Sequence, residues 1–211
     1  DIIIGVDYKS KKLKAIVDLY FAGKVNIKYI KTDKNKKPGD SLLKIIKKIG
    51  NGAIVVNLAD TYIKGLDLST IKNTLVVSDN FNDGRRWSSL SLDKSKNIIE
   101  FYDKKKLTEN QLVLTGVYGF KDISIFNQFD CSKQELEITD LCNFYINSGM
   151  DLVARKTEDW MDFGHIDRYQ FSKKRLIQSR EFNYLEFDDF FGTISKKSKN
   201  PEKLRNEINW Y

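Results

Sequence analysis

The sequence predicts an α/β protein whose sheet is mixed and mostly parallel. Residues 2–6 form a continuous run rich in β-branched side chains, which is typical of a strand buried on both faces. Residues 13–20 then place apolar side chains at helical spacing, and residues 25–30 alternate as the next strand. This order implies a right-handed crossover between parallel neighbours.

A second helix and a buried strand follow and end at an acid. Ser41 is expected to cap the helix, residues 42–49 carry its apolar stripe, and glycines at 50 and 52 stop it. Residues 53–58 are then expected to form another buried strand, and Ala59 and Asp60 follow at its end. Because ligands of open parallel sheets bind beyond the carboxyl ends of the strands, Asp60 is placed where a ligand is expected.

From residue 74 the pattern changes to an antiparallel insertion. Strands are expected at residues 75–77, 87–93, 97–102 and 112–120, with a turn at 82–84. A capping box at 132–135 predicts a helix that carries Leu136, Leu141, Phe144 and Tyr145, and a short strand is expected at 152–155. Asn200 and Pro201 begin a further helix in a C-terminal extension.

Composition restricts the class of protein. The chain has 211 residues, 41% hydrophobic and 31% charged, which is ordinary for a globular protein. No long apolar run predicts a membrane span or a signal peptide, so we expect a cytoplasmic location without membrane contact. Two cysteines and one histidine cannot form a usual zinc site, so any metal is expected to be a hard cation bound by oxygen.

A net charge of +7 raises the question of nucleic-acid binding. The lysines are scattered among acids, however, and the aromatic residues follow core spacing rather than lying among the lysines. We therefore expect no nucleic acid as a partner. Solvated faces are the first explanation of the charge, and attraction for a small phosphorylated substrate is the next.

The densest group of reactive side chains lies at residues 158–165, which include Trp160, Asp162 and the chain's one histidine, His165. Two acids at strand ends that converge on one crevice suit Mg²⁺ that keeps several waters and binds substrate phosphates. Asp60 and Asp162 are the predicted metal ligands and catalytic residues. The alternative is that each aspartate only shapes a turn.

The order of four short motifs resembles the sugar-nucleotide nucleotidyltransferases, which join a nucleoside triphosphate to a sugar 1-phosphate and release pyrophosphate. Residues 57–60, Asn-Leu-Ala-Asp, resemble the family's strand with the first metal-binding aspartate, and residues 160–164, Trp-Met-Asp-Phe-Gly, resemble its Trp-x-Asp-x-Gly segment. Between them, residues 101–105 resemble the Glu-Lys-Pro element and residues 115–120 the strand beside the sugar. The resemblance implies a three-layer Rossmann-like (GT-A-like) fold.

The resemblance also implies site residues. Lys104 would meet the sugar phosphate as a catalytic residue, and the predicted substrate-binding residues are Asn57, Gly116, Tyr118, Trp160, Gly164 and His165. For Trp160, packing that wedges the loop of Asp162 is the alternative, and for His165 it is a role in fixing a turn. Trp87, after two arginines, belongs to an arm over the site or to a contact in a homodimer.

The match runs from Asp1 to Gly164, so we expect a nucleotidyltransferase core at residues 1–164 and an extension at 165–211, which leads to a linker or another domain. Residues 165–169, 179–183 and 196–200 resemble the tails of the branch found in capsule and surface-polysaccharide gene clusters. That branch leaves the base and the phosphate acceptor open, with a cytidine nucleotide and a non-sugar acceptor among the options.

Two departures from the family pattern matter. The family's glycine-rich loop, which wraps the triphosphate, is expected before Asp1, and residues 5–7 lack the glycine pair and basic residues of such a loop. The Glu-Lys-Pro element has aspartate and lysine in place of glutamate and proline. The lysine of the family element therefore matches Lys104 only to within one position. The 211-residue chain is therefore expected to be inactive or very weak.

Two other classes compete with an active nucleotidyltransferase. One is a catalytically inactive module of the same fold that binds nucleotide-sugars or regulates. The other is a glycosyltransferase, which would need an Asp-x-Asp pair after the central strand, whereas residues 57–60 supply one acid.

Overall fold

The computed structural model describes residues 1–7, 10–34, 36–80, 84–108, 110–130, 135–179, 184–188 and 193–197, with the backbone alone for 177–179 and the last two ranges. Five predicted features lie wholly or partly outside these residues, namely the turn at 82–84, the capping box at 132–135, the tail motifs at 179–183 and 196–200, and the helix that begins at Asn200. The chain forms two compact units. Unit 1 comprises Asp1–Leu58 and Gly65–Glu158, and unit 2 comprises Ala59–Lys64 and Asp159–Tyr211.

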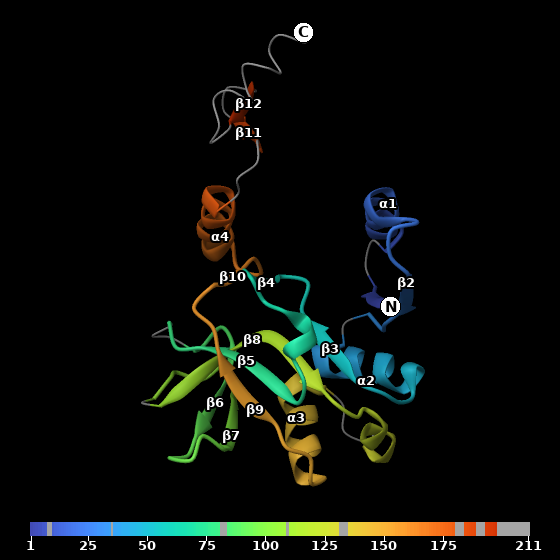
Figure 1. The fold of residues 1–211 in the computed structure, drawn as a ribbon, viewed down its shortest axis with the longest axis vertical. Coiled ribbons are helices and arrows are strands. Elements are labelled where there is room, and N and C mark those ends of the chain that lie inside the picture. The colour runs from blue at the N-terminus through green and yellow to red at the C-terminus, as the bar shows by residue number, and fades with distance from the viewer. Residues whose placement is uncertain are drawn as a thin grey trace. The chain divides into compact units, whose positions relative to one another are not determined.

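The main sheet of unit 1 is built from the predicted strands (Figure 1). Its order is β7-β6-β8-β5-β9, and β3 also pairs with β8. The strands are β3 (Ile54–Asn57), β5 (Thr74–Ser78), β6 (Ser88–Leu92), β7 (Ile98–Asp103), β8 (Gln111–Phe120) and β9 (Val153–Lys156). The mixed α/β class is confirmed.

The balance of strand directions differs from the expectation of a mostly parallel sheet. Among the described strands of this sheet, β5 and β9 pair in parallel, whereas the pairs β3–β8, β5–β8, β6–β7 and β6–β8 are antiparallel. The reason is the long strand β8, which runs antiparallel to three neighbours. The continuous apolar runs of β5 and β8 reflect burial on both faces rather than parallel pairing, whereas β3 alternates and leaves Val55 exposed.

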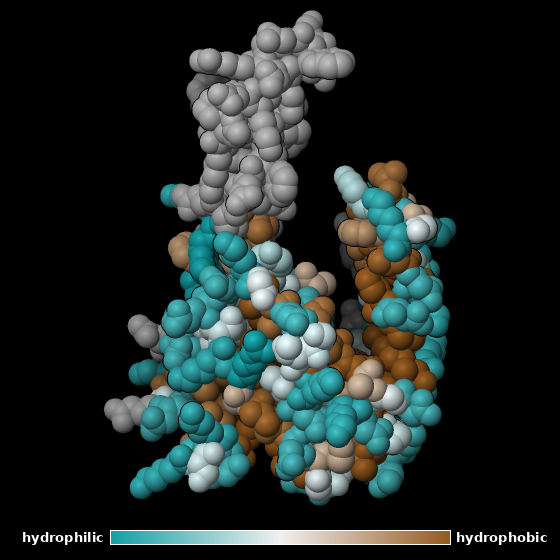
Figure 2. Space-filling view, in the orientation of Figure 1, coloured by the Kyte–Doolittle hydropathy of each residue, from teal (hydrophilic) through white to brown (hydrophobic). Residues whose placement is uncertain are grey.

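The predicted strand, helix and strand at the N-terminus are confirmed as β1 (Ile2–Val6), α1 (Ser10–Phe21) and β2 (Ile27–Lys31). The predicted burial of the first strand on both faces is wrong, because Ile2 is 47% exposed and Val6 is the one buried residue of β1. The two strands pair in parallel, Ile2 opposite Ile27. Although α1 has the predicted apolar residues, the described part of the chain leaves several of them exposed, with Ile16 at 56% and Tyr20 at 61%. Apolar residues accordingly show on the surface over α1 and its sheet (Figure 2).

Two helices pack against the main sheet but begin at other residues than predicted. The helix α2 (Pro38–Ile49) starts three residues before Ser41, and the Asp40 carboxylate accepts the Lys37 N–H at 3.2 Å. The helix α3 (Ile138–Asn147) starts after Leu136, and Asp140 accepts the Glu137 N–H at 2.9 Å. The Lys37 ammonium and the Glu137 carboxylate are 2.6 Å apart, and this hydrogen bond raises the pKa of Lys37.

The core lies between these helices and the sheet. It joins Leu42, Leu43 and Ile46 of α2, Leu141, Cys142 and Tyr145 of α3, and Leu75, Val77, Leu114, Tyr118 and Phe120 of the sheet. The Tyr145 hydroxyl donates to Asn73 Oδ1 at 2.9 Å and accepts the Asp122 N–H at 3.2 Å. This buried hydroxyl is therefore paired, as buried polar groups usually are.

Unit 2 contains the short pair β4 (Thr61–Ile63) and β10 (Trp160–Asp162), the helix α4 (Ile166–Ser179), and the antiparallel pair β11 (Tyr184–Asp188) and β12 (Thr193–Lys197). The sequence predicts a helical extension and gives no indication of the β11–β12 pair. The predicted boundary after Gly164 stays a prediction. Among the described residues, no helix has the length and apolar character that crossing a membrane requires.

Candidate functional site

The short pair β4–β10 brings the two predicted acids together, although about a hundred residues separate them in the chain. Asp162 is the last residue of β10 and lies opposite Thr61, the first residue of β4. Asp60 precedes Thr61 directly, in a turn. The Phe163 N–H continues the pairing by donating to the Asp60 carbonyl at 2.8 Å. The antiparallel register therefore places both aspartates at one end of this pair.

Gly164 lies between the two carboxylates. A methyl group at its α-carbon would be 2.5 Å from Asp60 Oδ2 and 3.3 Å from Asp162 Oδ1. Because both distances start from the same methyl carbon, their sum is the upper limit of the separation between Asp60 Oδ2 and Asp162 Oδ1. A side chain at position 164 would fill the space that the acids enclose, which gives a packing reason for glycine there.

The Asp162 carboxylate is held by the residues that follow it. The Gly164 N–H donates to Oδ1 at 2.8 Å, and His165 Nδ1 lies 2.8 Å from Oδ2. Because an ionised carboxylate only accepts hydrogen bonds, Nδ1 carries the hydrogen of this contact. Asp162 is 6% exposed, whereas the His165 side chain is 35% exposed. This contact over three residues favours the turn-fixing alternative for His165, and its place as a substrate-binding residue stays a prediction.

The helix α4 contributes a residue that the sequence analysis missed. The Ser172 hydroxyl donates to the Asp162 carbonyl at 2.7 Å, and Ser172 is 2% exposed. The available signal was helical spacing, because Ser172 lies two turns after His165 and so shares its face of a helix.

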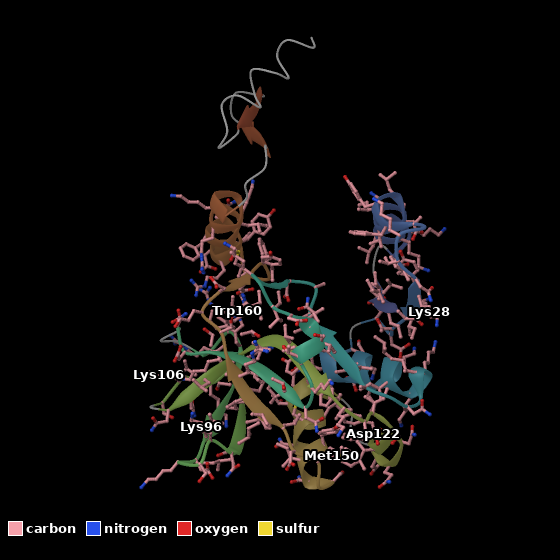
Figure 3. The ribbon with its side chains drawn as sticks, in the orientation of Figure 1. Lys28, Lys96, Lys106, Asp122, Met150 and Trp160 are labelled. Carbon is pink, nitrogen blue, oxygen red and sulfur yellow. The ribbon has the colours of Figure 1, made fainter. Side chains whose placement is uncertain are left out.

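Trp160 lies at the start of β10 in Figure 3 and is buried. It pairs with Ile63 across the two strands, and the Arg175 guanidinium is 3.5 Å from its carbonyl. Burial favours the packing role for this side chain over stacking on a ligand. Its place as a substrate-binding residue stays a prediction.

Four predicted site residues lie in unit 1. Lys104 directly follows β7, is exposed and has φ 49°, in the left-handed region. Asn57 ends β3, and its side-chain amide donates to the Leu58 carbonyl at 3.0 Å. The roles of Lys104 and Asn57 in the site stay predictions.

The other two, Gly116 and Tyr118, lie on β8. Gly116 has φ 95° where the register of β5 and β8 shifts, and its carbonyl accepts the Leu58 N–H at 2.9 Å. This bulge is a backbone reason for glycine. Tyr118 is 4% exposed and belongs to the core, which favours packing.

The donor set of unit 2 fits a magnesium ion better than a transition metal. Two carboxylates converge at Gly164, and hard oxygen ligands of this kind suit Mg²⁺, which retains several waters. Within the part of the chain that the structure describes, no cluster of three or more His, Cys, Asp or Glu side chains could hold a metal. A cation here would thus take its remaining ligands from water and substrate.

The chain belongs to the nucleotidyl transferase family, whose model matches residues 2–179. That range includes both aspartates, the β4–β10 pair and α4. The family assignment agrees with the resemblance on which the sequence analysis relied. Comparison with the sequences of curated proteins finds no match.

Solved structures of nucleotidyltransferases share the fold. A candidate glucose-1-phosphate thymidylyltransferase from Bacillus anthracis, in complex with a sucrose, matches with a TM-score of 0.71 and 22% identity over 87% of this chain and 78% of its own. HddC from Yersinia pseudotuberculosis, complexed with GMP-PN, matches with a TM-score of 0.59 and 17% identity over 83% and 78%. The inositol-1-phosphate CTP transferase from T. maritima matches with a TM-score of 0.61 and 12% identity over 82% and 75%.

Proposed function

We propose that this chain is the core of a magnesium-dependent enzyme that transfers a nucleoside monophosphate from a nucleoside triphosphate to a sugar 1-phosphate or a related small phosphate, with release of pyrophosphate. The observation that carries this proposal is the convergence of the Asp60 and Asp162 carboxylates on Gly164. Two acids in that arrangement supply the oxygen ligands that a phosphate-bound Mg²⁺ ion needs. Membership of the nucleotidyl transferase family supports the reaction class.

Each residue of the site has a proposed task. Asp60 and Asp162 would hold Mg²⁺, which supplies positive charge beside the phosphate oxygens when bound. The Gly164 N–H and His165 Nδ1 keep the Asp162 carboxylate in one orientation. For unit 1 taken by itself, the resemblance supports Lys104 as a residue that would bind the acceptor phosphate as a point charge. The protein then contributes position and electrostatics more than covalent chemistry.

The proposed substrates follow from the resemblance and agree with the ligands of related folds. HddC was solved with GMP-PN, a T. maritima relative is a CTP transferase for inositol 1-phosphate, and the B. anthracis relative was solved with a sucrose. We propose that the product is a precursor of a surface polysaccharide, made in the cytoplasm, where nucleoside triphosphates are available. A homodimer stays an open alternative.

The test is pyrophosphate release by the full-length gene product. Each nucleoside triphosphate would be combined with a panel of sugar 1-phosphates and non-sugar phosphate esters, with and without Mg²⁺. Magnesium-dependent release that needs one specific acceptor supports the proposal. Release that continues at full rate in Asp60→Asn and Asp162→Asn variants would contradict the assigned metal ligands.

A second candidate is a catalytically inactive module that binds nucleotide-sugars. Residues 103 and 105 favour it, because aspartate and lysine replace the glutamate and proline of the family's Glu-Lys-Pro element. Calorimetry with Mg²⁺ and nucleotides separates the two candidates. Binding of a nucleotide-sugar without any turnover of triphosphate would support the inactive module.

A further inference from the structure

Ser172 makes an unusual contact for a serine in the middle of a helix. Such serines usually face solvent or donate to the carbonyl four residues earlier in their own helix. Ser172 instead donates to the carbonyl of Asp162, outside α4, at 2.7 Å, and is 2% exposed. A buried hydroxyl that reaches another element fixes the distance between the two elements at that point.

The partner of this hydroxyl is one of the two proposed metal ligands. The main chain of Asp162 pairs with Thr61 of β4, and its side chain accepts from Gly164 and His165. From the second turn of α4, the Ser172 hydroxyl adds a hydrogen bond to the Asp162 carbonyl. In the first turn of α4, the Tyr169 N–H donates to the His165 carbonyl at 2.6 Å. Hydrogen bonds within the segment from Asp162 to Ser172 thus link its first residue to its last.

We propose that Ser172 is a positioning residue that sets the direction of the Asp162 carboxylate from α4. If the carbonyl of Asp162 were released, β10 could rotate at its last residue and carry the carboxylate away from Asp60. The effect on metal affinity rests on the proposed function, whereas the effect on the Asp162–His165 contact does not.

Ser148 is a matched control for the same chemical change. Its hydroxyl donates to the Phe144 carbonyl at 2.8 Å, which is the ordinary contact within a helix, and it lies at the end of α3 in unit 1. Ser148→Ala therefore removes one hydroxyl-to-carbonyl hydrogen bond without touching either aspartate. Ser172→Thr keeps the hydroxyl and tests for rescue.

The chain's one histidine makes the experiment direct, because all histidine ring signals in an NMR spectrum come from His165. Spectra would be recorded at one pH for wild type, Ser172→Ala, Ser172→Thr and Ser148→Ala, first without metal and then with Mn²⁺ as a paramagnetic substitute for Mg²⁺. We expect Ser172→Ala to shift the ring signals without metal and to weaken Mn²⁺ binding about tenfold, the lower end of the range for outer-shell partners. Ser172→Thr should restore both, and Ser148→Ala should change neither.

Two outcomes separate this proposal from the proposed function. Ring signals of metal-free Ser172→Ala that coincide with those of wild type would overturn the positioning role, whatever the metal result. If Mn²⁺ fails to broaden the wild-type signals, the metal site itself is wrong, while the metal-free spectra still decide the role of Ser172. Should Ser172→Thr not fold, the difference between Ser172→Ala and Ser148→Ala decides the question.

Discussion

The two aspartates of the site are close to the same glycine but are held in different ways. Asp162 is buried, ends a paired strand and accepts two hydrogen bonds at its carboxylate and one at its carbonyl. Asp60 lies exposed in a turn, and the Phe163 N–H holds its carbonyl. The site thus combines a carboxylate of fixed direction with one that can adapt.

Because of this difference, we expect both aspartates to matter for metal binding but only one of them to matter for stability. Both carboxylates are proposed ligands, so the loss of either should remove metal binding. Of the two carboxylates, the structure shows hydrogen bonds from Gly164 and His165 to that of Asp162, so we expect its loss, rather than that of Asp60, to weaken folding. In addition, two like charges near each other oppose folding when no cation lies between them.

The largest effect is expected for Asp162→Asn. Mn²⁺ affinity should fall by more than about 100-fold, because even outer-shell partners of a metal cost about 10- to 100-fold. The free energy of unfolding should fall by about 1–3 kcal/mol, because the hydrogen bond from His165 loses its charged acceptor. Calorimetric titration and urea unfolding measure the two quantities. Full metal affinity in this variant would exclude Asp162 as a ligand.

Asp60→Asn should cause a similar loss of metal affinity without a loss of stability. Because the side chain is exposed, its unfolding free energy should stay within about 0.5 kcal/mol of wild type in the absence of metal. Mg²⁺ should raise the unfolding temperature of wild type by mass action but not that of this variant. A loss of stability as large as that of Asp162→Asn would break the comparison between the two acids.

Gly164→Ala tests the space between the carboxylates. The added methyl group would lie 2.5 Å from Asp60 Oδ2, so the exposed Asp60 side chain must turn away. We expect about tenfold weaker Mn²⁺ binding and little change in stability, by analogy with outer-shell changes at metal sites. The control is Gly5→Ala, whose methyl group would meet Ile45 Cδ1 at 2.8 Å in unit 1 and should leave Mn²⁺ affinity unchanged.

The smallest effects are expected at His165. His165→Ala removes the donor to Asp162 Oδ2 and should weaken Mn²⁺ binding about tenfold or less. His165→Gln keeps an N–H donor and should recover most of the affinity. Equal losses in both variants, together with a loss of acceptor affinity in the full-length gene product, would instead favour direct contact of the imidazole with substrate.

Local sequence patterns predicted most strands but not every helix start. The strands β5 and β8 follow directly from their apolar runs at residues 75–77 and 112–120. The start of α2 was placed at Ser41 because serine is a good cap, yet the helix begins at Pro38. A good capping residue does not exclude an earlier start, and here the Asp40 carboxylate pairs with the N–H of Lys37.

The candidate site was predictable in part. The order of the motifs selected Asp60 and Asp162 as candidate metal ligands, because both carry the acid that a hard cation needs. The structure brings both carboxylates to Gly164, and their role in metal binding stays a prediction. The role of His165 was left between substrate and turn, and Ser172 was missed. The contact of His165 with Asp162 is local, three residues apart, whereas the hydrogen bond from Ser172 depends on how α4 packs on β10, for which helical spacing gives only an indirect signal.

The sequence by itself determined the class of fold, the order of its elements and the chemistry of the two acids, because hydrophobic periodicity and residue type are local properties. Only the tertiary structure decided the direction of the strands and the pairing of β4 with β10, because register depends on hydrogen bonds between distant segments. The same pairing brings Asp60 and Asp162 to one glycine and leaves one carboxylate fixed and the other exposed.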